Sequence, residues 1–381
     1  MQSPYLLWQY PGWPGMHYDA ARIGEALARA KRAQGVVEGK LSALGFGEQQ
    51  AMASCAQASA ARAWAQEAMA TSAIEGEHLD LLAVRSSVAR RLGVEVPKGP
   101  VTPRHVDGLL DIMDDAVRRA AQPLTDERLY GWQAALFPTG YSGMRSILVG
   151  RYRTNPMQIV SGPYGQETVH YEAPGADAVR GEMANFLAWF NAERGEDTLL
   201  KAALAHLWFE TIHPFDDGNG RVGRNIVDLC LARDAGESSR LVRISQQLLQ
   251  VRDAYYDALG DAQHGDLEIT AWLTWFIEQV RLAWERAASV VDASLEKARY
   301  WSVHGAIDLT PRQRKAVNSL LDRGSGGFEG GLNTRKYVSI TGASRATASR
   351  ELMELAELGL LAQVGAGRSV RYYINLPGWQ G

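Results

Sequence analysis

The sequence predicts a mainly α-helical protein, and three observations lead to this fold class. Apolar residues recur at helical spacing over most of the chain. One stretch, 151–172, is instead rich in proline, glycine and β-forming residues, which predicts a β-hairpin within the helical part. The last block has short helical segments followed by two β-forming runs. We therefore expect an N-terminal helical domain (1–100), a central helical bundle with a hairpin (101–295) and a C-terminal domain (305–381).

Composition is that of an ordinary soluble globular protein. The chain has 381 residues, of which 46% are hydrophobic and 22% charged, and its net charge of −3 argues against a dedicated polyanion binder. Cys55 and Cys230 lie far apart and outside any CxxC pair, so neither a disulfide framework nor a zinc site is expected. We find no leader pattern and no apolar run long enough to cross a bilayer, so we expect a cytoplasmic protein without a membrane partner.

In the N-terminal domain, apolar positions at helical spacing predict helices over 19–44 and 48–75. Gly45 would end the first helix, and Gly76 stands where the second would have its C-terminal cap. Two antiparallel helices are the simplest interpretation.

The central domain has seven further stretches with an apolar face and helix breakers between them. The predicted helices are Leu109–Val117, Arg128–Leu136, Ala178–Asn191, Leu199–Thr211, Arg221–Asp234, Val251–Leu259 and Ile269–Val290.

The C-terminal block predicts three helices and a hairpin. Thr310 caps a helix with Pro311 at its first position, and Ser344 caps the third helix. The expected helices are 312–321, 334–340 and 345–358, and the expected strands are 360–364 and 369–374. This order is typical of a winged helix-turn-helix domain.

The segment 213–224 reads HPFDDGNGRVGR and joins two of the predicted helices. Pro214 should end the first helix. The Gly218-Asn219-Gly220 run can adopt positive φ angles, which lets backbone N–H groups converge on an anion. A helix that begins near Arg221 would add its N-terminal N–H groups and its dipole. The sequence therefore predicts a polyphosphate site.

Three side-chain types in the same segment fit a nucleotide. Arg221 and Arg224 are three residues apart, so both can clamp phosphate from one helix face. Asp217 can supply a carboxylate to Mg²⁺. His213 has an ordinary pKa suited to a general base near neutral pH.

The segment matches every fixed position of the Fic motif, H-x-F-x-[DE]-G-N-G-R-x-x-R, so the chain resembles Fic-domain protein adenylyltransferases. The resemblance implies transfer of AMP from ATP to a Ser, Thr or Tyr hydroxyl of a protein, with Mg²⁺. It implies that His213 is the base, that Phe215 packs in the core and that Asp217 holds the metal. The residues it assigns to the nucleotide are Gly218, Asn219, Gly220, Arg221, Val222, Gly223 and Arg224.

Two other stretches resemble family features of lower specificity. The hairpin 157–171 corresponds to the flap on which a target protein segment docks by β-augmentation, with Val160 and Ser161 near the nucleotide. Tyr255 and Tyr256 correspond to a tyrosine pair at the adenine, with Gln263 as a weaker candidate. Aromatic core packing explains either tyrosine equally well from sequence alone.

Thr71-Ser-Ala-Ile-Glu75-Gly76 fits the family's inhibitory pattern, [ST]-x-x-x-E-[GN]. The resemblance implies an N-terminal inhibitory helix whose Glu75 docks on Arg224 and misaligns ATP. Without the resemblance, Glu75 reads equally well as a solvated residue in a last helical turn. A further alternative is that Glu75 orients a water for removal of AMP from a modified protein.

A second class of function rests on the C-terminal block. Residues 305–381 contain ten Lys or Arg and six Asp or Glu, a net charge of +4. In a winged helix the third helix would enter the DNA major groove, and the hairpin would meet the backbone. The candidate contacts are Ser344, Arg345, Thr347, Arg350, Arg368 and Arg371. This predicts a DNA-binding regulator with a sensing or self-modifying Fic core.

Glu351, Glu354 and Glu357 argue against DNA because they would repel phosphates if they faced it. Such domains also serve as protein-docking or homodimer surfaces, so DNA is a possible partner of 305–381 but not the favoured one. The sequence also leaves UTP and GTP open as donors.

Overall fold

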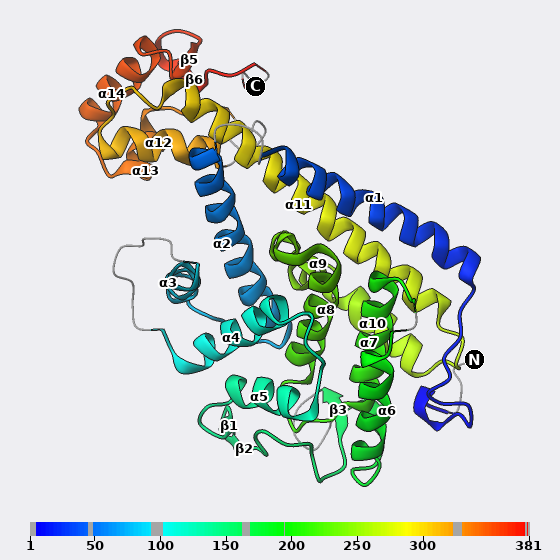
Figure 1. Cartoon of the computed structure of the whole chain (residues 1–381). Helices are drawn as coiled ribbons and strands as arrows, with labels where there is room; N and C mark the ends of the chain where they lie inside the picture. Colours follow the sequence, from blue (N-terminus) through cyan, green and yellow to red (C-terminus); the bar gives the residue numbers. More distant parts are fainter. Residues whose placement is uncertain are drawn as a thin grey trace. The chain divides into compact units, whose positions relative to one another are not determined.

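The computed structural model describes residues 5–44, 49–92, 102–161, 168–193, 195–322, 330–377 and 379, with the backbone alone at 43, 44, 49–59, 161 and 368. The chain forms two compact units. Met1–Leu41 and Ala60–Ala288 make up the first, and Ser42–Ser59 and Ser289–Gly381 make up the second. The expected mainly helical fold is confirmed (Figure 1). The expected domain boundaries at 100 and 295 stay predictions.

Eleven named α-helices contribute to the described part of the first unit, and α1, α2 and α11 also run into residues assigned to the second. Their bounds are α1 Ala20–Leu44, α2 Gln49–Ile74, α3 Leu81–Arg91, α4 Arg104–Arg118, α5 Asp126–Leu136, α6 Val179–Asn191, α7 Thr198–Ile212, α8 Asn219–Ala235, α9 Ile244–Gln250, α10 Arg252–Gln263 and α11 Thr270–His304.

Most of these helices match the predicted ones, with three differences. The apolar periodicity of the sequence did not predict α3 or α9, and it placed the end of α11 at Val290. Helix α11 continues to His304 because no glycine or proline interrupts residues 270–304. Two short paired strands, β1 (Tyr141–Ser142) and β2 (Arg145–Ser146), were also missed, since two-residue strands carry no periodic signal.

Helices α7 and α8 form the buried centre of the first unit. Every residue of α7 except Thr198 and Lys201 is buried, which is expected of a helix that is apolar on all sides. Helix α8 packs against α7, and α4 and α6 cover the pair (Figure 1). The loop 213–218 that joins α7 to α8 therefore starts and ends in the core.

The predicted hairpin consists of β3 (Gln158–Ser161) and β4 (Thr168–Glu172), which are antiparallel. Tyr171 is buried, and its hydroxyl donates to the carbonyl of Thr211 at 2.8 Å, which fastens β4 to α7. In the described strands β3 and β4 pair only with each other. The turn at 162–167 lies outside the described residues.

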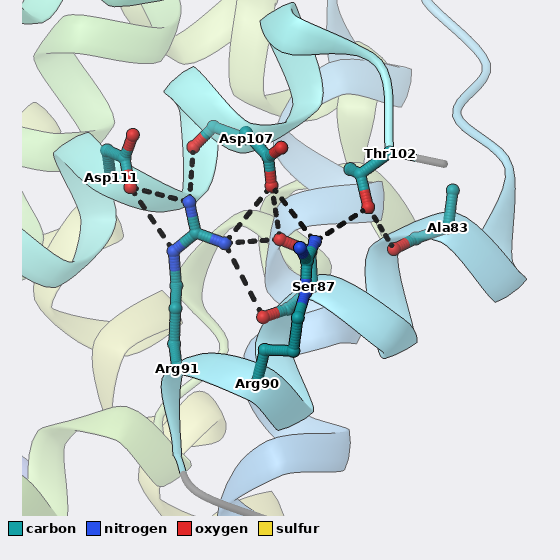
Figure 2. Close-up of polar contacts among 7 residues, drawn as sticks. All are labelled: Ala83, Ser87, Arg90, Arg91, Thr102, Asp107 and Asp111. Carbon is teal, nitrogen blue, oxygen red and sulfur yellow. Dashed lines mark hydrogen bonds and ion pairs between the residues drawn. The ribbon is translucent and has the colours of Figure 1, made fainter. Parts of the chain in front are cut away.

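Helix α3 is held on α4 by a cluster of polar side chains (Figure 2). Arg91 of α3 donates to Asp107 of α4 at 3.2 Å and to Asp111 at 2.5 Å. The hydroxyl of Ser87 donates to the same Asp107 carboxylate. Asp107, with 33% of its side chain exposed, thus lies at the centre of the cluster. Asp111, with 63% exposed, lies at its edge.

The second unit has its own hydrophobic core. Its elements are α12 Pro311–Leu321, α13 Thr334–Thr341, α14 Arg345–Glu357, β5 Leu361–Val364 and β6 Arg371–Ile374, and the end of α11 contributes Tyr300 to the same core. Thr310 and Ser344 cap α12 and α14 as expected. The order of three helices and a hairpin is the expected one; its assignment to the winged-helix class stays a prediction.

Two of the three glutamates that argued against DNA are engaged within this unit. Glu351 is 3% exposed and accepts from the Tyr337 hydroxyl at 2.7 Å and from Arg312 at 2.8 Å. Glu354 accepts from the Gln313 amide at 3.0 Å. The condition under which the three glutamates would repel phosphate, that they face the DNA, is therefore not met by Glu351, because its side chain points into the unit.

We expect Asp107→Ala to lower the free energy of unfolding by about 1–3 kcal/mol, because it leaves the partly buried Ser87 and Arg91 groups without their acceptor. Asp111→Ala is the matched control and should change it by less than about 0.5 kcal/mol, since that carboxylate is mostly solvated. Urea unfolding measures both. Equal losses in the two variants would contradict the central position of Asp107.

Candidate functional site

The segment 213–218 begins where α7 ends. His213 is the C-cap of α7 and has left-handed backbone angles, φ 50° and ψ 61°. The residue that precedes a proline is disfavoured in helix, so Pro214 ends α7 here as predicted. Buried Arg153, which the sequence analysis missed, donates to the carbonyl of His213 at 2.8 Å, and its backbone N–H donates to that of Pro214 at 2.8 Å. These bonds fix the backbone that carries the histidine.

Helix α8 begins at Asn219, earlier than predicted, and this changes the expected anion nest. Of the Gly218-Asn219-Gly220 run, only Gly218 has a positive φ, 88°. Asn219 instead closes the loop with its side chain, which accepts from the N–H of Phe215 at 2.9 Å and donates to its carbonyl at 2.8 Å. Of the positions that were expected to be able to adopt a positive φ, the chain therefore uses only Gly218 in this way, and the Asn219 side chain and the first turn of α8 shape the rest of the loop. Phe215 itself is fully buried.

Asp217 stands at the start of α8. One carboxylate oxygen accepts from the N–H of Gly218 at 2.5 Å, the other pairs with the Ser142 hydroxyl, and the side chain is 36% exposed. No group of three or more possible protein metal ligands exists among the described residues. Mg²⁺ commonly takes only one or two carboxylates and completes its shell with phosphate and water. A single accessible carboxylate beside the predicted phosphate site fits this preference.

The side chain of Arg224 is 2% exposed and is bound by the end of α2. Its guanidinium donates to the Thr71 hydroxyl at 2.9 Å, to the Thr71 carbonyl at 3.0 Å and to Glu75 Oε1 at 2.7 Å. The first and fifth residues of the predicted inhibitory pattern thus contact the same arginine. Gly76 follows the end of α2 with φ 79°, as its predicted cap position requires.

Gly220 provides the space for this contact. A Cβ at this position would lie 2.2 Å from Oε1 of Glu75 and 2.9 Å from the Arg224 guanidinium. The glycine is therefore required by close approach and not by its backbone angles.

A second carboxylate, Glu77, pairs with the other arginine of the segment. Its Oε2 is 2.9 Å from Arg221, and its Oε1 is 3.6 Å from His105. The sequence analysis missed Glu77 because a charged residue after a helix carries no periodic or motif signal. Both arginines expected to hold phosphate are thus paired with carboxylates from one short segment.

Helix α10 fixes the end of α2. The carbonyl of Ile74 accepts from Arg252 at 3.1 Å and from the Tyr256 hydroxyl at 3.3 Å. Tyr256, one of the two tyrosines predicted at the adenine, therefore also contacts the segment that is predicted to be inhibitory.

A cavity of about 790 Å³ brings many of the predicted residues together. The residues from the sequence analysis that line it are Glu75, Val160, His213, Gly220, Arg224, Tyr255, Tyr256 and Gln263. Val160 and Tyr256 are exposed at 46% and 41%, whereas Tyr255 is buried at 1%. The side chain of Ser161 lies outside the described residues.

Other predicted residues are not among those that line the cavity: Asp217, Gly218, Asn219, Arg221, Val222 and Gly223. Val222 is fully buried and donates its N–H to the Gly218 carbonyl, so both its backbone and its side chain serve the fold. The assignment of these six residues to nucleotide and metal stays a prediction.

Burial dominates the electrostatics around His213. It lowers the pKa of His213 to about 4 and that of His206 to about 3, and it raises the pKa of Glu210 to about 8. The imidazole of His213 is therefore neutral at pH 7, which is the state a base needs.

Two family models match the chain. Residues 123–231 match the model described as Fic/DOC family, and residues 6–94 match one described as a domain of unknown function, DUF4172. The Fic match contains the whole segment 213–224. These matches support a Fic-family protein.

Curated relatives of the Fic region carry the name protein adenylyltransferase. A probable protein adenylyltransferase of Aquifex aeolicus (strain VF5) is 33% identical over 86 residues, which cover 23% of this chain and 24% of that protein. Protein adenylyltransferase Fic of Culex quinquefasciatus is 38% identical over 87 residues, which cover 22% of this chain and 16% of that protein. The matches thus span about a quarter or less of these relatives.

A solved structure extends the likeness in fold beyond the Fic region. The crystal structure of a Fic family protein from Desulfovibrio desulfuricans G20 has a TM-score of 0.52 and 21% identity, and the alignment covers 98% of each chain. None of the helices in the described ranges has the length and apolar character needed to cross a membrane.

We expect the low pKa of His213 to appear as pH-dependent stability. The folded pKa of about 4 lies below the ordinary 6.5, so this group's contribution is present above pH 6.5 and is lost as the pH falls. Between about pH 7.5 and 5 the loss through this one group should be about 2 kcal/mol. Urea unfolding of the parent and of His213→Gln at both pH values measures it. A variant that loses as much stability as the parent over this range would contradict a largely buried, neutral imidazole.

Proposed function

We propose that this chain transfers AMP from ATP to a hydroxyl group of a protein, with His213 as the general base. The observation that carries the proposal is that His213, at the end of α7, and Arg224, in α8, line the same cavity. The Fic match over this loop and the adenylyltransferase names of relatives support Fic-type AMPylation at the level of the family.

In this reaction the neutral imidazole of His213 takes the proton of the attacking hydroxyl. The hydroxyl oxygen then forms a bond to the α-phosphorus, and pyrophosphate leaves. Arg221 and Arg224 bind the phosphates once they are released from Glu77 and Glu75, and the N-terminus of α8 adds its N–H groups. Mg²⁺, held by Asp217 and the phosphates, would supply positive charge that neutralises the polyphosphate.

For the base of ATP, Tyr256 is the better placed of the two tyrosines. It is the more exposed, and its ring lies beside the cavity, whereas the Tyr255 hydroxyl is bonded to His206 at 2.9 Å inside the core. The protein target would dock along β3 and β4, whose Val160 and Val169 side chains are exposed on the cavity rim. We also propose that this chain is located in the cytoplasm.

Autoinhibition by the end of α2 is the second part of the proposal. Glu75 occupies the position on Arg224 that the γ-phosphate would take in a productive complex. ATP could therefore bind only with its γ-phosphate displaced. Misplacement of reacting groups by about 1 Å can cost about 10²-fold in rate. The ion pair between Glu77 and Arg221 adds to the inhibition because it occupies the second arginine that is expected to bind phosphate. The alternative use of Glu75, orientation of a water for AMP removal, is compatible with the same contact.

We expect Glu75→Gly to raise AMP transfer about tenfold or more, because it frees Arg224 for phosphate. His213→Ala should abolish transfer both alone and combined with Glu75→Gly. Labelled ATP with Mg²⁺, followed by mass spectrometry of the enzyme and of a lysate, measures the product and identifies the modified residue.

Parallel reactions with UTP and GTP identify the donor in the same assay, and purified AMP-modified target tests AMP release. A double variant as active as Glu75→Gly alone would exclude His213 as the base. Incorporation from none of the three nucleotides would reject the nucleotidyl-transfer proposal.

DNA binding by 305–381 is a second candidate function, favoured by one observation. The inward position of Glu351 removes one acidic group from the approach to α14, while Arg345 and Arg350 are exposed. The side chain of Arg368 lies outside the described residues.

We expect the full chain to retard random duplex DNA at low salt if this candidate holds, and Arg345→Glu with Arg350→Glu to abolish the shift. Removing one arginine that binds a phosphate should reduce the slope of log affinity against log salt by about one. Arg29→Glu, at an exposed arginine of α1, is the control for charge alone. No shift at low salt, or equal effects of both variants, would reject DNA binding and leave 305–381 as a protein-docking or homodimer surface.

A further inference from the structure

A buried carboxyl group next to His213 has no role in the mechanism above. His206, Glu210 and His213 follow each other at four and three residues along α7, so they share one face of the helix. His206 is 0% and Glu210 4% exposed. An acidic side chain is almost never buried to this extent unless it is paired or has a function.

This carboxyl lies on the Nδ1 side of the His213 ring. The distance from Nδ1 of His213 to Oε2 of Glu210 is 3.6 Å. Nδ1 of His213 is buried and without a hydrogen-bond partner among the described residues, and so are Nδ1 of His206 and Oε1, the other oxygen of the Glu210 carboxyl group. Buried polar atoms normally have a partner, so an unpartnered Nδ1 beside this carboxyl group indicates a bond that forms in another state of the site.

Helix α8 leaves room for the carboxyl group. A Cβ on Gly223 would lie 2.3 Å from Oε1 of Glu210, so only glycine is compatible with its present position. Position 223 is variable in the sequence pattern of the segment, and in this chain the carboxyl of Glu210 explains the glycine found there.

We propose that Glu210 is a positioning residue that accepts the Nδ1 proton of His213 and so keeps Nε2 free to take the proton of the attacking hydroxyl. Closing the 3.6 Å separation to a hydrogen bond of about 2.8 Å needs less than about 1 Å of side-chain movement. The nitrogen of a histidine that carries the proton is set by the bond its other nitrogen makes. This inference deepens the proposed function and rests on it for its catalytic part.

Proton and bond balance are simple. The proton passes from the hydroxyl to Nε2, the oxygen–phosphorus bond forms, and the bond to the departing pyrophosphate breaks. Both imidazole nitrogens then carry protons, and the Nδ1–H···Oε2 bond stabilises that cation. A neutral carboxyl also accepts through its carbonyl oxygen, so the bond does not require Glu210 to be ionised.

The charged groups around the pair come from several elements. Arg224 of α8 and Glu75 after α2 act on Glu210. Arg153, Glu75 and Asp217 act on His213, and the backbone carbonyl of Glu210 is the rival acceptor for its Nδ1 proton. That carbonyl already accepts from the amide of Gln263 at 3.1 Å. This backbone carbonyl remains present whatever side chain stands at position 210. A change of the Glu210 side chain therefore distinguishes the two acceptors.

The deciding experiment reads the tautomer of His213 by NMR of the full chain labelled with ¹⁵N-histidine, at about pH 7.5. The signal of His213 is the one missing in His213→Ala. We expect Nδ1 to be protonated in the parent, Glu210→Leu to shift the population to the Nε2–H form, and Glu210→Gln to keep the parent tautomer through its amide oxygen. Glu77→Gln, which removes a carboxylate paired with Arg221, is the control and should leave the tautomer of His213 unchanged.

Kinetics in the Glu75→Gly background test the catalytic part. Glu210→Leu should lower kcat by about 10- to 100-fold with an unchanged KM for ATP, as is typical when the partner of a functional histidine is removed. Glu210→Gln should recover most of kcat. A role in folding alone would lower thermal stability without this split between kcat and KM and without a tautomer shift.

A parent-like tautomer in Glu210→Leu would overturn the inference and assign the bond to the backbone carbonyl. If Glu210→Leu does not fold, Gly223→Ala displaces the carboxyl by steric contact and should give the same tautomer shift. Failure of AMP transfer in every variant would reject the proposed function, whereas the NMR result would still decide the role of Glu210.

Discussion

A buried guanidinium has to be neutralised, and Arg224 imposes this requirement on the whole site. Its side chain is 2% exposed, so leaving it without a partner would carry a large desolvation cost. Thr71 and Glu75 meet the requirement with three hydrogen bonds. Any ligand that takes their place must bring negative charge to the same spot. In the proposed function, the position of α2 is therefore coupled to the occupancy of the cavity by an anion.

Burial also determines the protonation states of the residues at the α7 end of the loop 213–218. Because α7 is enclosed on almost every side, the residues along its C-terminal half are removed from water. Burial disfavours the charged forms of His206, His213 and Glu210. It therefore lowers the pKa values of the two histidines and raises that of Glu210. A neutral imidazole is thereby maintained at neutral pH. The same packing that stabilises the fold prepares the proposed base.

Particular elements explain how much of this the sequence could predict. The long helices and the hairpin were predicted from apolar period and breakers, and the cap at Gly76 from residue type, because these signals are local. Helix α3, helix α9 and the two-residue strands were missed, since short segments depend on what they pack against. The sequence showed that the Gly218-Asn219-Gly220 run can adopt positive φ angles, but not that only Gly218 does so and that the Asn219 side chain closes the loop.

The sequence by itself determined which chemical groups the site contains: an imidazole, two guanidinium groups, a carboxylate and a glycine-rich turn at one fixed spacing. Only the tertiary structure decided what each of them faces. It brought Glu75 to Arg224 across 149 residues and Glu77 to Arg221 across 144, and it buried Glu210 beside His213. Spacing along a chain fixes local geometry, whereas partners and burial depend on the packing of helices that are distant in sequence.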